Sequence, residues 1–242
     1  MTSASIDEAI RNVVAVGADP SRVAILDNFC WPSVDDEITM GTLVSACEAC
    51  RAAALAYDTP FISGKDSLHN QFTNRETNQV IRIPRTLLIS AIGVVPDVRK
   101  CVTMDLKDPR EGRLCLVYPK AVNLPALASV HKAVAEAISR GMVLSCHDVS
   151  DGGVLVAAAE MCIASGLGLS IECDDPFSES NARYLVEIQS QRLADVEKLL
   201  GQRGTAIKVL GNVTAEPNLV CGPECSVDID ELTSAWRGTL DW

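Results

Sequence analysis

The sequence predicts an α/β (α+β) fold in two parts. The second part is expected to have a mixed sheet flanked by helices. From about residue 98 onward, short apolar runs typical of strands alternate with longer runs of helical periodicity, which favours helices packed on a sheet. Before that point, Pro96 and Asp97 break a β-rich run. We therefore divide the 242 residues into a segment 1–97 and a segment 98–242.

The first segment opens with a helix. Ile6, Ala9, Ile10 and Val13 recur at helical spacing, and the run that begins at Ser5 has the form of a capping box. The later elements are short and varied: a strand over 22–26 that ends at Asp27, a helix over about 36–57, a strand over 61–63, a polar turn over 64–67, a hairpin-like segment over 70–79 and a strand-like run over 87–95.

The second segment alternates regularly. Its best-marked helix has Pro125 in the opening turn and Gly141 just after its end. The expected strands are 101–104, 114–118, 142–145, 169–172, 184–188 and 206–213, and the expected helices are 125–139, 154–164, 192–200 and 230–236.

Composition excludes several classes of function. A net charge of −11 and only four Phe, three Tyr and three Trp argue against nucleic-acid binding. The apolar stretches are short and the first five residues lack a signal-peptide pattern, which predicts a cytoplasmic protein that does not bind membranes. Ten cysteines in that setting are expected to be reduced, and the pairs Cys47 with Cys50 and Cys221 with Cys225 only weakly suggest zinc.

The most informative stretch is Ser145-Cys146-His147-Asp148-Val149-Ser150-Asp151-Gly152-Gly153, between a strand-like and a helix-like run. Ionisable groups there meet two glycines and a helix N-terminus, which favours a phosphate or nucleotide site. An ordinary connection in which Ser150 or Asp151 caps the helix explains these residues equally well.

Two residues of the first helix suit a metal ion. Glu8 and Asn12 are four residues apart on one face, opposite the apolar stripe. A carboxylate and an amide oxygen suit Mg²⁺ with phosphate and water as further ligands. Spacing alone favours a solvated helix face over a metal site.

Two positions of the first segment suit a ligand at strand ends. Asp27 is expected at the carboxyl end of its strand, where ligands collect in α/β sheets. Gly64-Lys65-Asp66-Ser67 offers close backbone approach, a cation and oxygen ligands. It is not a Walker A loop, because Thr59 stands where the first glycine is needed.

The histidines do not indicate a hydrolase or a zinc enzyme. No Ser, His and Asp arrangement and no metal-ligand spacing can be assembled from the sequence. His147 is the histidine best placed for a site, whereas His69 is expected in a loop and His131 on a helix surface.

Taken together, these motifs resemble the catalytic subunit of phosphoribosylformylglycinamidine synthase, the ATP-dependent amidotransferase of purine biosynthesis. The matching runs follow the family's order: Asp7-Glu8-Ala9-Ile10-Arg11-Asn12-Val13-Val14, Ile25-Leu26-Asp27-Asn28, Ile62-Ser63-Gly64-Lys65-Asp66-Ser67-Leu68, His147-Asp148-Val149-Ser150-Asp151-Gly152-Gly153 and Phe177-Ser178-Glu179-Ser180. The His-Asp run alone indicates the wider superfamily of aminoimidazole ribonucleotide synthetase.

The resemblance implies a domain plan. Family members have two similar halves, each with an N-type ATP-binding domain and a C-terminal α/β domain. The chain resembles the second half only, so residues 1–97 are expected to form a partial N-type domain and residues 98–242 the C-terminal-type domain. Strand edges without their neighbours predict dimerisation or local disorder.

The resemblance also implies roles for individual residues. It places the family's catalytic histidine in the first half, so no catalytic role transfers to His147. By resemblance, Asp27, Gly64 and Lys65 contribute to ATP binding at the catalytic site and Ser67 to substrate binding, while Glu8, Asn12 and Asp148 are metal ligands of an auxiliary nucleotide site and Ser150 touches its nucleotide. Shorter relatives have Asn where Lys65 stands, so only a direct phosphate contact is expected there.

The function implied is a carbon–nitrogen ligase that uses ATP and Mg²⁺. The family converts formylglycinamide ribonucleotide and glutamine-derived ammonia to formylglycinamidine ribonucleotide. The implied partners are the first half of the synthetase and a glutaminase, and the segment alone is expected to be inactive. Two alternatives stay open: a non-catalytic ADP–Mg²⁺ binding and assembly module, and a stand-alone relative that acts on another phosphorylated small molecule.

Overall fold

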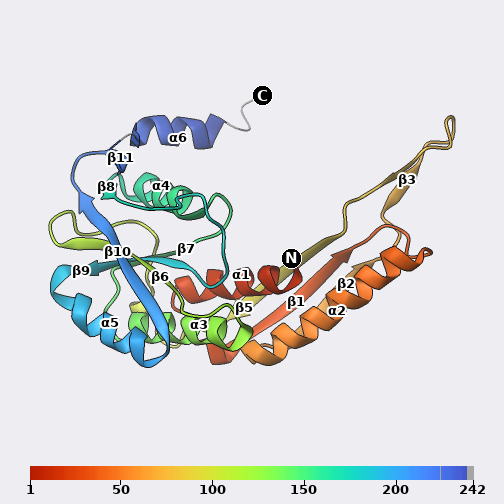
Figure 1. Cartoon of the computed structure of the whole chain (residues 1–242), viewed down its shortest axis with the longest axis horizontal. Helices are drawn as coiled ribbons and strands as arrows, with labels where there is room; N and C mark the ends of the chain where they lie inside the picture. The colour runs from red at the N-terminus through yellow and green to blue at the C-terminus, as the bar shows by residue number, and fades with distance from the viewer. Residues whose placement is uncertain (224, 239–242) are drawn as a thin grey trace.

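The computed structural model describes residues 1–223 and 225–238, and it shows an α/β protein with two main sheets (Figure 1). Of the strands up to Gly93, three form a small sheet and two form a separate hairpin, whereas those from Gly112 onward form a larger sheet. A boundary at residue 97 is compatible with this division and stays a prediction.

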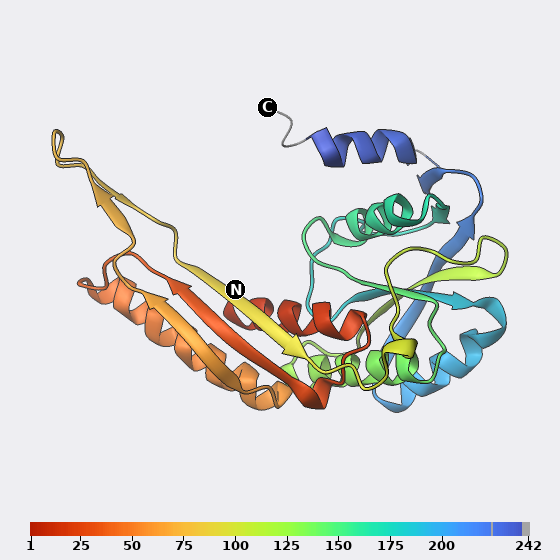
Figure 2. The ribbon, with the colours of Figure 1, turned by 180° about the vertical axis from the view of Figure 1, so that it is seen from behind.

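The small sheet has the order β2-β1-β5. Strand β1 (Val23–Cys30) pairs in parallel with β2 (Phe61–Ser67) and antiparallel with β5 (Thr86–Gly93). Helices α1 (Thr2–Ala15) and α2 (Glu37–Tyr57) lie behind these strands in Figure 2 and cover the same face. The side chains of Val23, Ile25 and Phe29 alternate toward that face and are buried.

A two-stranded hairpin extends away from this sheet. Strands β3 (Gln71–Thr73) and β4 (Val80–Arg82) pair antiparallel, and Figure 1 shows them at the end of a long arm. The hairpin expected over 70–79 is therefore present and pairs with residues just beyond it.

The large sheet is mixed and has seven strands among the described residues. All neighbours pair antiparallel except β11 with β8. In spatial order the strands are β12 (Cys225–Asp228), β11 (Asn218–Cys221), β8 (Gly168–Ile171), β10 (Thr205–Thr214), β6 (Gly112–Pro119), β9 (Tyr184–Gln189) and β7 (Ser145–Asp148).

Helices cover both faces of the large sheet. Figure 1 shows α3 (Leu124–Ser139) and α5 (Leu193–Gln202) on one side, and α4 (Gly153–Ser165) and α6 (Ile229–Gly238) on the other. Each side has its own apolar core, and the core under α3 continues into the small sheet. The described residues also form the 3₁₀ turns η1 (Pro20–Arg22), η2 (Val98–Lys100) and η3 (Ser190–Arg192).

Several predicted elements are displaced in the structure. Helix α1 starts at Thr2, so Ser5 lies within it and donates a hydrogen bond to the Met1 carbonyl instead of capping the helix. Strand β7 begins at Ser145, so the His-Asp run is the strand itself. The strand expected over 101–104 is irregular chain after η2, and β11 and β12 were not predicted.

Helix α2 is apolar along its length but largely exposed. Among the described residues it is the one helix long and apolar enough to cross a membrane, which is weak evidence because a helix of a folded protein passes the same test. Its buried residues are Thr39, Ala46, Cys50, Ala53 and Tyr57, which pack toward the core.

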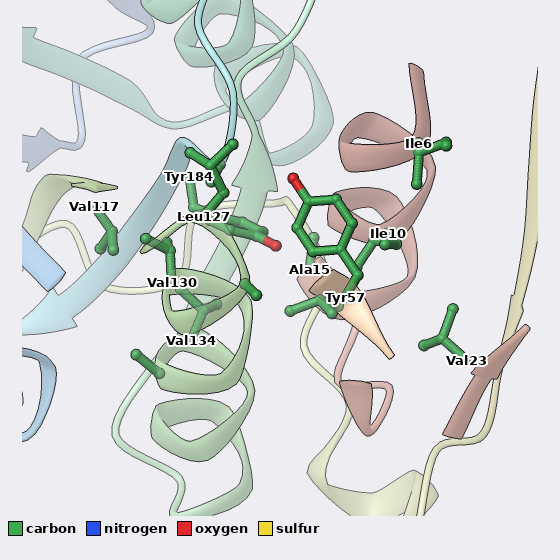
Figure 3. Packing of buried hydrophobic residues seen from close by; sticks show 14 of the residues in the cluster. Ile6, Ile10, Ala15, Val23, Tyr57, Val117, Leu127, Val130, Val134 and Tyr184 are labelled. Atoms are coloured by element: carbon green, nitrogen blue, oxygen red, sulfur yellow. The ribbon is translucent and has the colours of Figure 1, made fainter. Parts of the chain in front are cut away.

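A buried carboxylate joins the two parts of the chain. Asp7 on α1 is completely buried and accepts hydrogen bonds from Arg11 (2.5 Å), the Tyr57 hydroxyl (2.9 Å), the Ala182 N–H (2.8 Å) and, through Nε2, His131 (3.1 Å). Figure 3 shows Tyr57 between α1 and α3. Burial, the largest single influence, raises the pKa of Asp7, but these donors together hold it below its ordinary value.

His131 is therefore not a helix-surface residue, as the sequence suggested. Its side chain is buried on α3, and Nδ1 lies 2.7 Å from the Tyr184 hydroxyl on β9. The residues that enclose it come from α1, α2 and β9, which no local sequence pattern brings together.

Asp7→Asn should strongly destabilise the fold. The substitution leaves the guanidinium of Arg11 buried without its charge partner, a change that costs about 3–5 kcal/mol. Urea unfolding measures the loss. Glu8→Gln, on the exposed face of the same helix, should cost less than about 0.5 kcal/mol. Equal midpoints for the two variants would contradict a central role for Asp7.

Asp7 should also make stability depend on acid pH. Its folded-state pKa lies below the ordinary 3.8, so its contribution is present above about pH 4 and is lost as the pH falls through the folded-state pKa. We expect Asp7→Asn to flatten the acid limb of the stability curve. The measurement is the urea midpoint of both proteins between about pH 2.5 and 6. Parallel acid limbs would exclude Asp7 as a source of the acid sensitivity.

Candidate functional site

The site centres on the end of β7, which pairs with β9 near the N-terminus of α4. Asp148 is the last residue of this strand and is 6% exposed. Burial, the largest single influence, raises its pKa, but hydrogen bonds from His147 and Ser150 and the charges of His147 and Arg11 bring it below the ordinary value. The geometry therefore favours an ionised Asp148.

His147 bridges two carboxylates. Its Nδ1 lies 3.2 Å from Asp148 Oδ1, and its Nε2 lies 3.2 Å from Glu160 Oε2 on α4. Burial, the largest influence, lowers the pKa of His147, but the two carboxylates together raise it to about 9. An imidazolium at neutral pH donates from both nitrogens, so the geometry gives His147 the role of an ion-pair partner instead of a general base.

A cavity of about 530 Å³ lies above this strand end. It lies between α1, the turn that follows β7 and the loop between β8 and β9, so residues far apart in the sequence share it. Its polar lining consists of oxygen-bearing groups and one guanidinium: Glu8, Arg11, Ser150, Asp151, Glu179, Ser180 and Asn181.

Ser150 connects the cavity to Asp148. Its hydroxyl donates to Asp148 Oδ2 and accepts a 3.1 Å hydrogen bond from Arg11. The structure thus brings Glu8 and Ser150 to one cavity, with Asp148 one hydrogen bond behind Ser150. Asn12 is exposed on α1 and is not among the residues that line the cavity. Its role as a metal ligand stays a prediction.

The N-terminus of α4 differs from both interpretations of the sequence. The N-cap is Gly152, without a side-chain cap, so neither Ser150 nor Asp151 caps the helix. The N–H of Gly152 donates to Glu179 and that of Leu155 to the Pro176 carbonyl, so groups of one loop occupy part of the predicted anion site.

The two glycines at this turn are required by its geometry. Gly152 and Gly153 have φ of 78° and 70°, which favours glycine. A Cβ on Gly153 would lie 2.6 Å from the backbone of Phe177, because the same loop packs directly against it. The glycines therefore admit a protein segment here, where the sequence suggested close approach of a ligand.

The small sheet separates the other predicted site residues. Asp27 lies within β1 instead of at its end, and Gly64 to Ser67 continue β2 instead of forming a turn. Asp27 and Gly64 are paired in register and share the helix-covered face, where a Cβ on Gly64 would lie 2.0 Å from Asp27 Oδ1. Lys65 and Ser67 are hydrogen-bonded to each other on the opposite face.

Burial, the largest influence, and the nearby Asp66 carboxylate raise the pKa of Asp27. The two faces of the sheet thus offer different chemistry: a partly buried carboxylate on the side of α2, and an ammonium with a hydroxyl on the open side. Within this chain the four residues do not form one site, and their predicted contacts with ATP and substrate remain untested.

Sequence reasoning missed three residues of the site region. Arg11 lies four residues after Asp7, a spacing that could have signalled an ion pair but not its burial. Glu160 and Glu179 reach the site from separate segments. Among the described residues, no group of three or more His, Cys, Asp and Glu side chains is arranged to hold a metal ion.

Comparisons with known proteins agree with the fold and with the family resemblance of the sequence. Residues 108–222 match the family model described as AIR synthase related protein, C-terminal domain. Phosphoribosylformylglycinamidine synthase subunit PurL from Thermus thermophilus is 28% identical over 98% of this chain and 35% of that protein. PurL from Rhodopseudomonas palustris is 31% identical over 96% of this chain and 34% of that protein. The chain spans about a third of the length of these curated relatives.

Solved structures show the same fold at low identity. The match to the PurLQS structure from Thermotoga maritima covers 96% of this chain and 41% of the PurLQS chain, with a TM-score of 0.74 and 17% identity. The match to the structure of hydrogenase maturation protein HypE covers 94% of this chain and 81% of the HypE chain, with a TM-score of 0.68 and 12% identity. Residues 108–222 thus match the AIR synthase related C-terminal domain, and the chain resembles the C-terminal portion of PurL over nearly its whole length.

Proposed function

We propose that this chain forms part of an ATP-dependent carbon–nitrogen ligase that makes formylglycinamidine ribonucleotide in purine biosynthesis. The likeness to PurL over almost the whole chain supports this proposal, and structures of PurL from Thermotoga maritima are described as complexes with FGAR, ATP and ADP. The observation that carries the proposal for this chain is the cavity where Glu8 and Ser150 meet beside Asp148.

The cavity is proposed to take a nucleotide with Mg²⁺. Glu8 is exposed, and no hydrogen bond or ion pair of its side chain is found among the described residues, so its carboxylate is available. With Asp148 held ionised and the amide of Asn12 on the same helix, the donor set is oxygen-based and fits a hard cation. When bound, the cation supplies positive charge for the phosphates in an acidic region, and Ser150 contacts the nucleotide.

A second part of the proposal concerns the small sheet. Asp27, Gly64 and Lys65 are proposed to contribute to ATP binding at the catalytic site, and Ser67 to contact the ribonucleotide substrate. Asp27 and Lys65 lie on opposite faces of the sheet, and β2 is its edge strand, so one ligand would meet both residues only at this edge. No residue of this chain is assigned a catalytic role.

The proposed partners follow from the relatives. A first-half segment of the PurL type and a glutaminase would complete the enzyme in the cytoplasm, and the PurLQS structure supports the glutaminase. The exposed edges of the small sheet support association with such a segment or with a second copy of the chain.

Two other functions have specific support. The Glu8 and Asp148 region would equally serve a non-catalytic ADP–Mg²⁺ module that aids assembly. The likeness of fold to HypE, which extends over most of both chains, is compatible with a stand-alone relative that acts on another phosphorylated small molecule.

Asp148→Asn should weaken binding of ADP in the presence of Mg²⁺ by roughly 10-fold or more, because the substitution removes a negative charge that attracts the cation. Calorimetry with and without Mg²⁺ measures this change. Asp174→Asn is the matched control, since Asp174 is an exposed acid that pairs with Lys208 away from the cavity and should leave affinity unchanged. Equal affinity of wild type and Asp148→Asn would remove Asp148 from the site.

The isolated chain should not turn over formylglycinamide ribonucleotide with ATP and ammonia. The resemblance places the catalytic histidine outside this segment, and the structure gives His147 two carboxylate partners instead. Product formation, followed by chromatography, should stay at background and rise when a first-half segment is added. Robust turnover by the chain alone would contradict the prediction that the catalytic histidine lies outside this segment.

A further inference from the structure

Arg11 is the one cation among the described residues that line the cavity. It is 4% exposed, and one terminal nitrogen, Nη1, donates to Asp7 while the other, Nη2, donates to Ser150. Its third donor group, Nε–H, has no hydrogen-bond partner among the described residues. The side chain thus spans from the buried carboxylate to the cavity wall.

The guanidinium sets the direction of the hydrogen bonds that reach Asp148. Arginine can only donate, so the Ser150 oxygen must accept from it. The hydroxyl hydrogen is then directed to Asp148 Oδ2, which fixes the rotation of the carboxylate. Without Arg11 the hydroxyl could rotate toward solvent or ligand, and one oxygen of Asp148 would lose its donor.

The other end of Arg11 is held rigidly. Asp7, its ion-pair partner, also accepts from Tyr57, His131 and the Ala182 N–H, so α2, α3 and the turn before β9 determine the orientation of the carboxylate. A buried charged pair with these extra donors keeps Nη2 of Arg11 at one position relative to Ser150.

We propose that Arg11 is a positioning residue of the nucleotide site and acts through Ser150 to hold the Asp148 carboxylate in its binding orientation. This inference rests on the proposed function, because it assigns Arg11 to the cavity that would take ADP and Mg²⁺. The inference adds Arg11 to the site as a residue that affects binding through the Ser150 hydroxyl and not through contact with the ligand.

A double-mutant cycle tests the proposal on the full chain. Calorimetry gives the Kd of ADP with Mg²⁺ for wild type, Arg11→Lys, Ser150→Ala and the double variant. Each single substitution should weaken binding by roughly 10-fold, and the double variant should bind no more weakly than Ser150→Ala. A loss from Arg11→Lys that persists undiminished on the Ser150→Ala background would overturn the inference.

Tyr57→Phe is the matched control for stability. It removes a different hydrogen bond to Asp7 and leaves the Arg11 contact with Ser150 in place. We expect it to lower the urea midpoint but to keep the Kd within about twofold of wild type. An equal loss of affinity in Tyr57→Phe would show that Arg11 acts through stability alone and overturn its positioning role.

Further outcomes separate a failure of the positioning role from a failure of the proposed function. If Arg11→Lys does not fold, the single variant Ser150→Ala carries the test: it should weaken binding by roughly 10-fold, and affinity equal to that of wild type overturns the inference. If wild type binds ADP with Mg²⁺ and Arg11→Lys binds equally well, the positioning role of Arg11 is overturned, and the proposed function is not. A wild type that does not bind ADP with Mg²⁺ overturns the proposed function itself, and the positioning role with it.

Discussion

The burial of Asp7 is the constraint on which the rest of the structure depends. A carboxylate without solvent is tolerated only when donors surround it, and here they come from α1, α2, α3 and the chain just before β9. Those elements belong to both parts of the chain, so the ionised group fixes how the small sheet and the large one meet. Apolar packing between α1 and α3 would be less specific, because similar apolar contacts form at many relative orientations.

The geometry of the candidate site depends on the contacts at this junction. Helix α1 places Asp7 inward, and one turn later Arg11 links that carboxylate to Ser150 beside the end of β7. Glu8, adjacent in sequence to Asp7, points outward to the cavity. One helix therefore carries both the anchor of the fold and part of the site, so the position of Glu8 relative to Asp148 is set by the buried hydrogen bonds.

Local patterns predicted most of the helices and strands, because the periodicity of apolar residues records which face is buried. They failed where tertiary contacts decide. Gly64 to Ser67 look like a turn, yet they form a strand because β1 offers a parallel partner along their whole length. His131 looks like a surface residue of α3, but Asp7 and Tyr184 lie more than fifty positions away and satisfy both of its ring nitrogens. The motif order found the residues at the end of β7, whereas the roles of Arg11 and Glu160 depend on distances that no motif contains.

Electrostatics decides how an anionic ligand could enter the cavity. The chain has a net charge of −11, and Glu8, Asp151 and Glu179 line the cavity itself. The single guanidinium there is already committed to Asp7, and the imidazolium of His147 to Asp148 and Glu160. The α4 N-terminus does not supply the missing charge, because the Glu179 carboxylate accepts the Gly152 N–H. The positive charge that a nucleoside diphosphate needs must therefore arrive with the ligand, and a divalent cation bound to its phosphates meets that requirement.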